Sequence, residues 1–129
     1  MEAAEVFRYL IKQHQGNEQY WRGLGDALSG LADYKEAIKA YLKSLEVYSN
    51  PEIFISLGLA YQALGDNGSA GKAFESALDL DPENTQVLML LSDNLLSRNE
   101  HQAAKGLLEQ IIELEPSNAV ARDRLMKLK

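Results

Sequence analysis

The segment that most resembles a cofactor-binding motif is the glycine-rich run at residues 65–72, Gly-Asp-Asn-Gly-Ser-Ala-Gly-Lys. A phosphate-binding loop cradles phosphate with the backbone amides of a Gly-x4-Gly-Lys-Ser/Thr sequence that follows a strand. Here the spacing from Gly65 to Gly71 is one residue too long, and Ala73 replaces the required hydroxyl. No strand-like run precedes the segment, so it predicts a turn between helices rather than a nucleotide site.

The other side chains that could bind a metal or transfer a proton do not form a catalytic pattern. His14 and His101 are the only histidines, and the chain has no cysteine, which excludes a His-x3-His pair and a thiolate site. The acids within residues 79–83 and 109–115 lie near expected helix ends, without a burial pattern that would raise a carboxyl pKa. We expect no catalytic residue, metal or cofactor, and conclude that the chain is not an enzyme.

Composition indicates which elements must position any site. The 129 residues are 46% hydrophobic with three prolines and contain no alternating Val-, Ile- and Thr-rich run, which favours one helical domain without a sheet. The net charge of −6 argues against binding to nucleic acid, which requires clustered Lys and Arg. Residues 1–5 lack the layout of a signal peptide, and no apolar run is long enough for membrane insertion. The location is therefore cytoplasmic by default, unless the chain is a piece of a longer protein.

The strongest pattern in the sequence is a repeat of 33 or 34 residues. The pentapeptide Trp-Arg-Gly-Leu-Gly at 21–25 returns as Phe-Ile-Ser-Leu-Gly at 54–58, and a weaker third copy begins at Leu88. In each copy, apolar residues fall at helical spacing in two runs, which predicts a helical hairpin. Helices of about 13 residues are too short to be stable alone, so the hairpins must stack on one another. Turn signals divide the runs at residues 30–33, 65–68 and 99–100.

Three copies in the same register closely resemble the tetratricopeptide repeat signature. The matching residues are Trp21-x2-Leu24-Gly25-x2-Leu28 with Ala37-x3-Tyr41, Phe54-x2-Leu57-Gly58-x2-Tyr61 with Ala70-x3-Phe74 and Pro82, and Leu88-x2-Leu91-Ser92-x2-Leu95 with Ala104-x3-Leu108 and Pro116. The resemblance implies an all-α fold, a right-handed superhelical solenoid of antiparallel helix hairpins with three full repeats plus flanking helices. The sequence departs from the signature at Leu28 (usually tyrosine), Ser44 (alanine), Ser49 (proline) and Ser92 (glycine).

The resemblance divides the single domain, residues 1–129, into five units. Residues 1–17 match only the second helix of a repeat, so they form a half repeat. Residues 119–129 are expected to be a terminal capping helix. The full repeats occupy residues 18–50, 51–84 and 85–118.

Stacked hairpins form a curved array whose concave side is lined by the first helix of each repeat, and this side is the expected groove for a protein or peptide partner. Four apolar groove residues form a strip bordered by three acids, so we expect a partner with apolar anchors and basic flanks. The alternative is that the terminal helix or a neighbouring chain covers part of the strip. The groove positions away from the packing seam are Gln19, Arg22, Asp26, Glu52, Ile55, Ser56, Leu59, Gln86, Met89, Leu90 and Asp93.

The resemblance also excludes one type of partner. Family members that bind the acidic C-terminal tails of heat-shock chaperones use a clamp of Lys, Arg and Asn side chains. The matching positions in this chain are Arg22, Asp26, Ser56, Gln86 and Leu90. Only Arg22 keeps the required chemistry, so we do not expect the chain to bind chaperone tails.

The resemblance therefore implies a non-enzymatic protein–protein interaction module, a scaffold or adaptor that binds a peptide or an amphipathic helix in the concave groove. The alternative is an assembly element that forms a homo-oligomer or part of a longer repeat array in a multiprotein complex. Self-association would use apolar side chains of the two terminal helices, which an intact array would cover. These residues are Ala3, Phe7, Leu10, Leu125 and Leu128.

Overall fold

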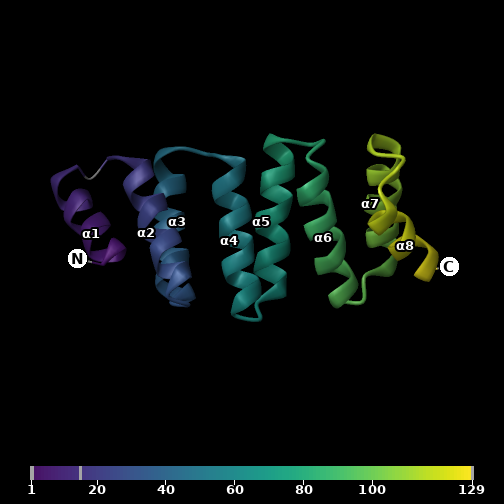
Figure 1. Ribbon diagram of the computed structural model, residues 1–129, viewed down its shortest axis with the longest axis horizontal. Helices are drawn as coiled ribbons and strands as arrows, with labels where there is room; N and C mark the ends of the chain where they lie inside the picture. Colours follow the sequence, from purple (N-terminus) through teal and green to yellow (C-terminus); the bar gives the residue numbers. More distant parts are fainter. Residues whose placement is uncertain (1, 15, 129) are drawn as a thin grey trace.

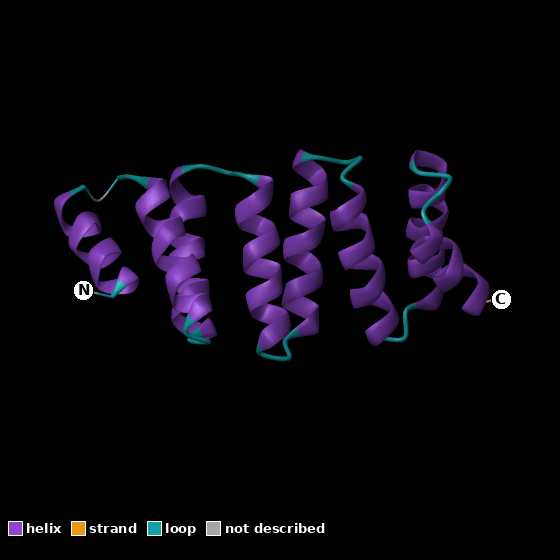
Figure 2. Cartoon of the chain, in the orientation of Figure 1, coloured by secondary structure: helices purple, strands orange, loops and turns teal. Residues whose placement is uncertain are grey.

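The structure, a computed structural model, describes residues 2–14 and 16–128, which form eight α-helices and no strand (Figures 1 and 2). Consecutive helices run antiparallel and lie in a single row from α1 to α8 (Figure 1). This architecture confirms the predicted all-α solenoid. The helices are α1 (Ala3–Gln13), α2 (Glu18–Gly30), α3 (Tyr34–Val47), α4 (Pro51–Ala63), α5 (Asn67–Leu80), α6 (Thr85–Ser97), α7 (His101–Leu114) and α8 (Ala119–Lys127).

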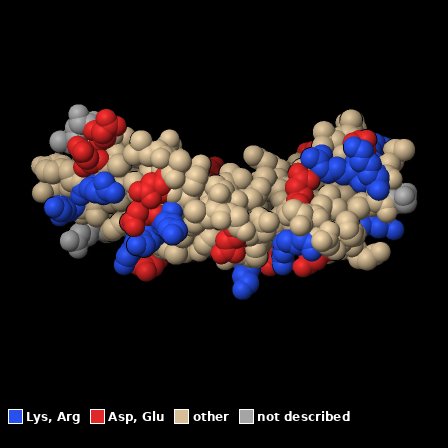
Figure 3. Space-filling view, turned by 90° about the horizontal axis from the view of Figure 1, so that it is seen from below, with Lys and Arg blue, Asp and Glu red and all other residues tan. Residues whose placement is uncertain are grey.

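The helices pack in the order of the sequence. Contact is most extensive within the pairs α2–α3, α4–α5 and α6–α7, while α1 packs on α2 and α8 packs on α7. Among non-consecutive helices, α2 and α4 make the most contact. The first helices α2 and α4 therefore contact each other directly. We assign the side lined by the first helices to the inner side of the bowed molecule that is visible in Figure 3.

Asparagine precedes every first helix. The side chains of Asn17, Asn50, Asn84 and Asn118 each accept a hydrogen bond from a backbone amide in the first turn, at 2.7 to 3.2 Å. Such a cap satisfies an amide that the first turn leaves without a helical partner. Because α8 is capped in the same way and at the same spacing, it begins like the first helix of a further repeat.

The turns inside the three pairs share one backbone conformation. Ala32, Gly65 and Asn99 have φ angles of 61°, 84° and 61°, in the left-handed region. In each case the amide of the next residue bonds the carbonyl five positions back, as Asp33 does with Leu28 at 2.9 Å. This hydrogen-bonding pattern satisfies carbonyls at the helix end and reverses the chain in few residues.

The turn predicted at residues 65–68 is shorter than the sequence signals suggested. Helix α5 begins at Asn67, so Gly68 is helical rather than part of the turn. The Asp66 carboxylate accepts a hydrogen bond from the Ser69 amide at 3.1 Å. This bond caps the first turn of α5 and lowers the pKa of Asp66.

Inside each hairpin a large side chain fills the space beside a small residue. A Cβ atom on Gly25 would lie 2.5 Å from Cε1 of Tyr41, and one on Gly58 would lie 2.5 Å from Cε1 of Phe74. Both rings are buried in the core. Glycine is therefore required at these two positions by the close approach of an aromatic ring, while Ser92 at the third equivalent position is also buried.

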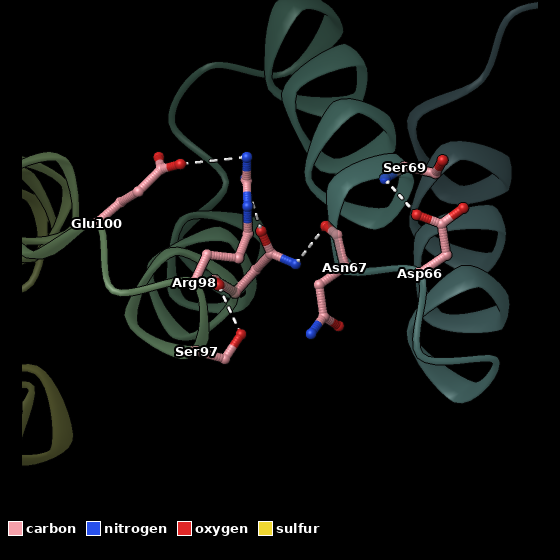
Figure 4. A network of polar contacts seen from close by, with 7 residues as sticks. Asp66, Asn67, Ser69, Ser97, Arg98 and Glu100 are labelled. Carbon is pink, nitrogen blue, oxygen red and sulfur yellow. Dashed lines mark hydrogen bonds and ion pairs between the residues drawn. The ribbon is translucent and has the colours of Figure 1, made fainter.

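The junction between α5 and α6 is polar (Figure 4). A Cβ atom on the buried Gly71 would lie 2.8 Å from Oδ1 of Asn94 and 2.9 Å from Nη1 of Arg98. Asn94 donates from Nδ2 to the Asn67 carbonyl at 2.9 Å and accepts a hydrogen bond from Arg98 at 3.3 Å. At the junction between α3 and α4, the position of Gly71 is occupied by the buried Ile38, so equivalent junctions use different chemistry.

Candidate functional site on the concave surface

The four apolar residues predicted for the groove all remain accessible in part. Leu59 on α4 is 45% exposed. Ile55, Met89 and Leu90 are half-buried, because they pack against the core formed around α5, α6 and α7. The apolar strip therefore keeps an open surface on two neighbouring first helices.

A hollow of about 350 Å³ lies at the C-terminal end of this strip. Gln86, Met89 and Leu90 of α6 form one wall, and Asn118 and Val120 before and in α8 form the other. Sequence reasoning predicted the first three residues for the groove but not the last two, although it allowed that the terminal helix could cover part of the strip. The regular spacing of the capping asparagines is the signal that could have placed α8 on this surface.

Two of the acids predicted to border the strip form ion pairs within the chain. Oε2 of Glu52 lies 2.9 Å from Nη2 of Arg22, which links α4 to α2. Asp93 on α6 holds Arg124 of α8 through two contacts, Oδ1 to Nε at 2.6 Å and Oδ2 to Nη2 at 3.2 Å. Such partly exposed pairs contribute about 0–1 kcal/mol to stability, but each neutralises an acid of the groove.

The third acid, Asp26, binds a buried phenol. The Tyr41 hydroxyl donates to Oδ1 of Asp26 at 2.6 Å and lies 3.3 Å from Oγ of Ser29. Burial, together with the hydrogen bond to Asp26, raises the pKa of Tyr41 to about 12. Asp26 therefore takes part in the packing of α2 on α3, a role that the sequence pattern did not reveal.

The remaining groove positions supply uncharged polar groups. Gln19 and Gln86 are exposed, and Ser56 is half-buried beside the Tyr41 hydroxyl. The concave surface thus combines an apolar strip with amides and with acids that already have partners. This arrangement is suited to binding an apolar segment.

The residues proposed for self-association on α1 differ in accessibility. Ala3 is exposed, whereas Phe7 and Leu10 are half-buried. The Phe7 ring lies so close over Gly23 that a Cβ atom there would collide with it. Phe7 therefore belongs largely to the α1–α2 contact, and Tyr9 is the more exposed apolar side chain of this helix.

The corresponding residues on α8 lie at the opposite end of the row (Figure 1). Leu125 and Leu128 are half-buried and pack against the core cluster shared by α6 and α7. Met126 between them is exposed. The two groups of terminal residues can therefore meet only between different copies of the chain.

Clustered metal ligands and membrane-spanning helices are both absent from residues 2–14 and 16–128. No three acids or histidines of these residues lie close enough together to hold a metal ion. Within the same residues, no helix combines the length and the apolar composition that a membrane span needs.

Comparisons with known proteins agree with the fold and its repeats. Sperm-associated antigen 1 of Mus musculus is 28% identical over 114 residues, which are 88% of this chain but only 12% of that protein. The solved structure of MamA matches 97% of this chain and 74% of its own, with a TM-score of 0.88 and 19% identity. The first TPR of Spaghetti (RPAP3), bound to the HSP90 peptide SRMEEVD, matches 87% of this chain and 92% of its own, with a TM-score of 0.73 and 24% identity.

The two solved structures, at these identities, show a shared fold alone. The family itself is shown by two models described as tetratricopeptide repeat, which match residues 1–51 and 61–126. Together with the repeated helix pairs of the structure, these matches show that the chain belongs to the tetratricopeptide repeat family.

Proposed function

We propose that the chain is a non-enzymatic binding module that holds an apolar segment of a partner protein on its concave surface. The family and the fold support a protein-interaction scaffold. The exposure of Leu59 is the observation that supports binding of an apolar segment on the concave surface. Leu59 occupies the same position in its repeat as Asp26 and Asp93, which both have partners within the chain, yet it remains 45% exposed.

We expect the partner segment to contact two apolar places on the concave surface. The first is formed by Leu59 and Ile55 on α4, and the second is the 350 Å³ hollow beside Met89 and Leu90. Burying one large apolar side chain contributes on the order of 1.5–3 kcal/mol. Two such anchors at neighbouring first helices fit an amphipathic helix or an extended segment.

Basic flanks on the partner are a secondary part of the proposal. A partner Lys or Arg would compete with Arg22 for Glu52 and with Arg124 for Asp93. Because exposed pairs contribute only about 0–1 kcal/mol, exchange of one cation for another changes affinity little. We therefore expect binding to weaken only slightly as salt is raised.

The similar solved structure binds an HSP90 peptide, but we do not propose that this chain binds such a peptide. Asp26 and Leu90 stand at two positions where the resemblance calls for groups that bind a peptide carboxylate. Asp26 is an acid held by Tyr41, and Leu90 is apolar. The surface favours apolar anchors over an acidic tail.

The double substitution Leu59→Ser with Met89→Ser tests the proposed groove. Partners are first recovered with the wild-type chain and identified by mass spectrometry, and their affinities are then measured for each variant. Loss of two apolar anchors should weaken binding by at least about tenfold, with little change in the circular dichroism spectrum.

A matched control is Leu31→Ser with Leu80→Ser, because these leucines are 62% and 48% exposed and lie outside the groove. The control should bind within about twofold of wild type. Wild-type affinity in the Leu59/Met89 variant, or equal loss in the control, would contradict a concave site.

The assembly element is a second candidate, favoured by the exposed apolar side chains at both ends of the row. Helix α1 matches the second helix of a repeat, and α8 begins like a first helix. Head-to-tail stacking would place α8 of one copy beside α1 of the next and cover Tyr9 and Met126. Light scattering should then show association that increases with concentration and is lost in Tyr9→Glu. A wild-type chain that stays monomeric at about 1 mM contradicts this candidate.

A further inference from the structure

We infer that the chain has a second protein-binding surface on its outer side, a groove between α1 and α3 that accepts an acidic amphipathic segment of a partner. Two adjoining hollows, of about 330 and 360 Å³, form this outer groove. They share Ile11, Lys12 and Trp21. This surface is separate from the concave strip and goes beyond the function proposed for that strip.

The floor of the outer groove is apolar. Trp21, Leu24 and Leu28 of α2 lie between Ile11 of α1 and Ala40 of α3. Leu24 and Leu28 are buried, but Trp21 is only half-buried, so the outer side of α2 stays accessible at the Trp21 ring. An apolar side chain of a partner can therefore reach the floor between the two outer helices.

The rim of the outer groove carries more cations than acids. Four cations against two acids give a local charge of +2, whereas the whole chain has 13 cations against 19 acids, a charge of −6. The rim therefore attracts acidic groups although the molecule as a whole repels them. The cations are Arg8, Lys12, Lys39 and Lys43, and the acids are Glu36 and Glu46.

The ion pairs already present leave these cations accessible to a partner. Lys39 lies 3.1 Å from Glu36, and Lys43 lies 3.6 Å from Glu46, in exposed pairs three residues apart on α3. Such helix-surface pairs are weak and exchange readily. Within residues 2–14 and 16–128, Arg8 and Lys12 form no ion pair.

The equivalent hollow one repeat further along shows that this chemistry is not a general property of the fold. It lies over Phe54 and has a volume of about 220 Å³. Its polar lining consists of Ser69, Lys72 and Ser76 beside the Tyr61 ring. A smaller volume and a single cation make it a poorer site for an acidic segment, so the outer groove over Trp21 differs from its counterpart in the second repeat.

Tryptophan fluorescence reports on the outer groove directly, because Trp21 is the only tryptophan of the chain. The probe is a synthetic helical peptide of about 14 residues with Leu and Phe on one face and Glu on the other. One control peptide carries Lys in place of Glu, and another carries Ala in place of Leu and Phe. The acidic amphipathic peptide should shift the Trp21 emission and bind at least about tenfold more tightly than either control.

Substitutions of the rim cations test whether the rim binds the acidic peptide. Arg8→Glu with Lys12→Glu should weaken binding of the acidic peptide at least about tenfold, and the milder Arg8→Gln with Lys12→Gln should weaken it less. Lys72→Glu is the matched control, since Lys72 occupies the position of Lys39 one repeat on, and it should stay within about twofold of wild type. Leu59→Ser with Met89→Ser should leave the Trp21 response unchanged, which separates this groove from the concave strip.

Three results would overturn the inference. The first is equal affinity for the Glu and Lys peptides, and the second is an unchanged response in both Arg8/Lys12 variants. The third is a Trp21 response to vesicles of phosphatidylserine and phosphatidylcholine in the absence of any response to the acidic peptide, which would assign the cations to an anionic lipid surface.

Discussion

The first and second repeats differ at one equivalent place on the concave surface, and the difference separates structural from available residues. In the first repeat, Tyr41 buries its ring beside Gly25 and needs an acceptor for its hydroxyl, which Asp26 provides at 2.6 Å. In the second repeat, Phe74 fills the same place without a hydroxyl, and the position of Asp26 is occupied by Leu59. The Tyr41 hydroxyl, which Phe74 lacks, thus explains why Asp26 is engaged in packing, while Leu59 at the same position of the second repeat remains exposed.

In the third repeat, as in the first, the acid at this position has a partner within the chain, but the partner is of a different kind. Its buried side chain is Leu108, which has no polar atom, yet Asp93 is still engaged because Arg124 of α8 binds it. Leu59 therefore lies between two acids that have partners within the chain. Leu59 itself, the apolar side chain at this repeated position, packs against no core cluster of the described residues and remains exposed.

The largest expected change in stability comes from moving the hydroxyl group from the first repeat to the second. Tyr41→Phe should lower the free energy of unfolding by about 2 kcal/mol, since it removes a hydrogen bond to a charged group. Phe74→Tyr should also destabilise the chain, because its hydroxyl would face Leu59. Phe74→Tyr combined with Leu59→Asp should recover most of the loss, as measured by urea unfolding. Additive effects in the double variant would show that the two positions are not coupled.

The same hydroxyl should make stability depend on pH in the alkaline range. The pKa of Tyr41 is raised from 10.0 to about 12, so the folded chain retains a proton that the unfolded chain releases. The contribution of about 2 kcal/mol is complete below pH 10 and is lost as pH rises toward 12. Unfolding of the wild type and of Tyr41→Phe, compared from pH 9 to 12, should converge. A constant difference across this range would contradict the assigned pKa.

Replacing each of the two buried serines that depart from the family signature with alanine should change stability in opposite directions. Ser44 donates its hydroxyl proton to the Glu18 carbonyl at 2.8 Å, whereas Oγ of the buried Ser92 has no hydrogen-bond partner among the described residues. Ser44→Ala should therefore cost about 1 kcal/mol, and Ser92→Ala should stabilise the chain by up to about 1 kcal/mol. Thermal unfolding of both variants gives the signs, and destabilisation by Ser92→Ala would indicate a partner for this hydroxyl.

The smallest expected effect concerns the turns of the first two repeats. Ala32 and Gly65 adopt the same left-handed conformation, which disfavours a residue with a Cβ atom. Ala32→Gly should stabilise the chain by about 0.5 kcal/mol, while Gly65→Ala should destabilise it by about 1 kcal/mol. Equal and negligible shifts in the unfolding midpoint would mean that the turns tolerate either residue.

The fold could be predicted from sequence because its repeated positions follow from packing geometry. Gly25 and Gly58 must be small where a ring approaches, and the spacing of these positions places the hairpins in register. The first repeat has Ser49 where the family signature has proline, and this difference does not change where the helix ends. Helix α3 ends at Val47 with Ser49 two residues on, as α5 ends at Leu80 before Pro82.

The polar contacts of the candidate site could not be predicted in the same way. Asp93 and Arg124 are 31 positions apart and lie on helices separated by α7. Whether their side chains meet depends on the rotation of each helix, which the repeat signature does not specify. The packing of Phe7 over Gly23 depends on the same rotation. The sequence therefore predicted which residues line the groove but could not predict which of them have partners within the chain.

Methyl NMR of the chain with a bound partner tests the central claim most directly. The leucine and methionine methyl groups are labelled and assigned, and the partner segment recovered with the wild-type chain is added in steps. We predict that the resonances of Leu59 and Met89 shift and show contacts to the segment, while those of Leu31 and Leu80 do not change. Unchanged Leu59 and Met89 resonances at saturation, with shifts elsewhere, would contradict the concave strip as the binding site.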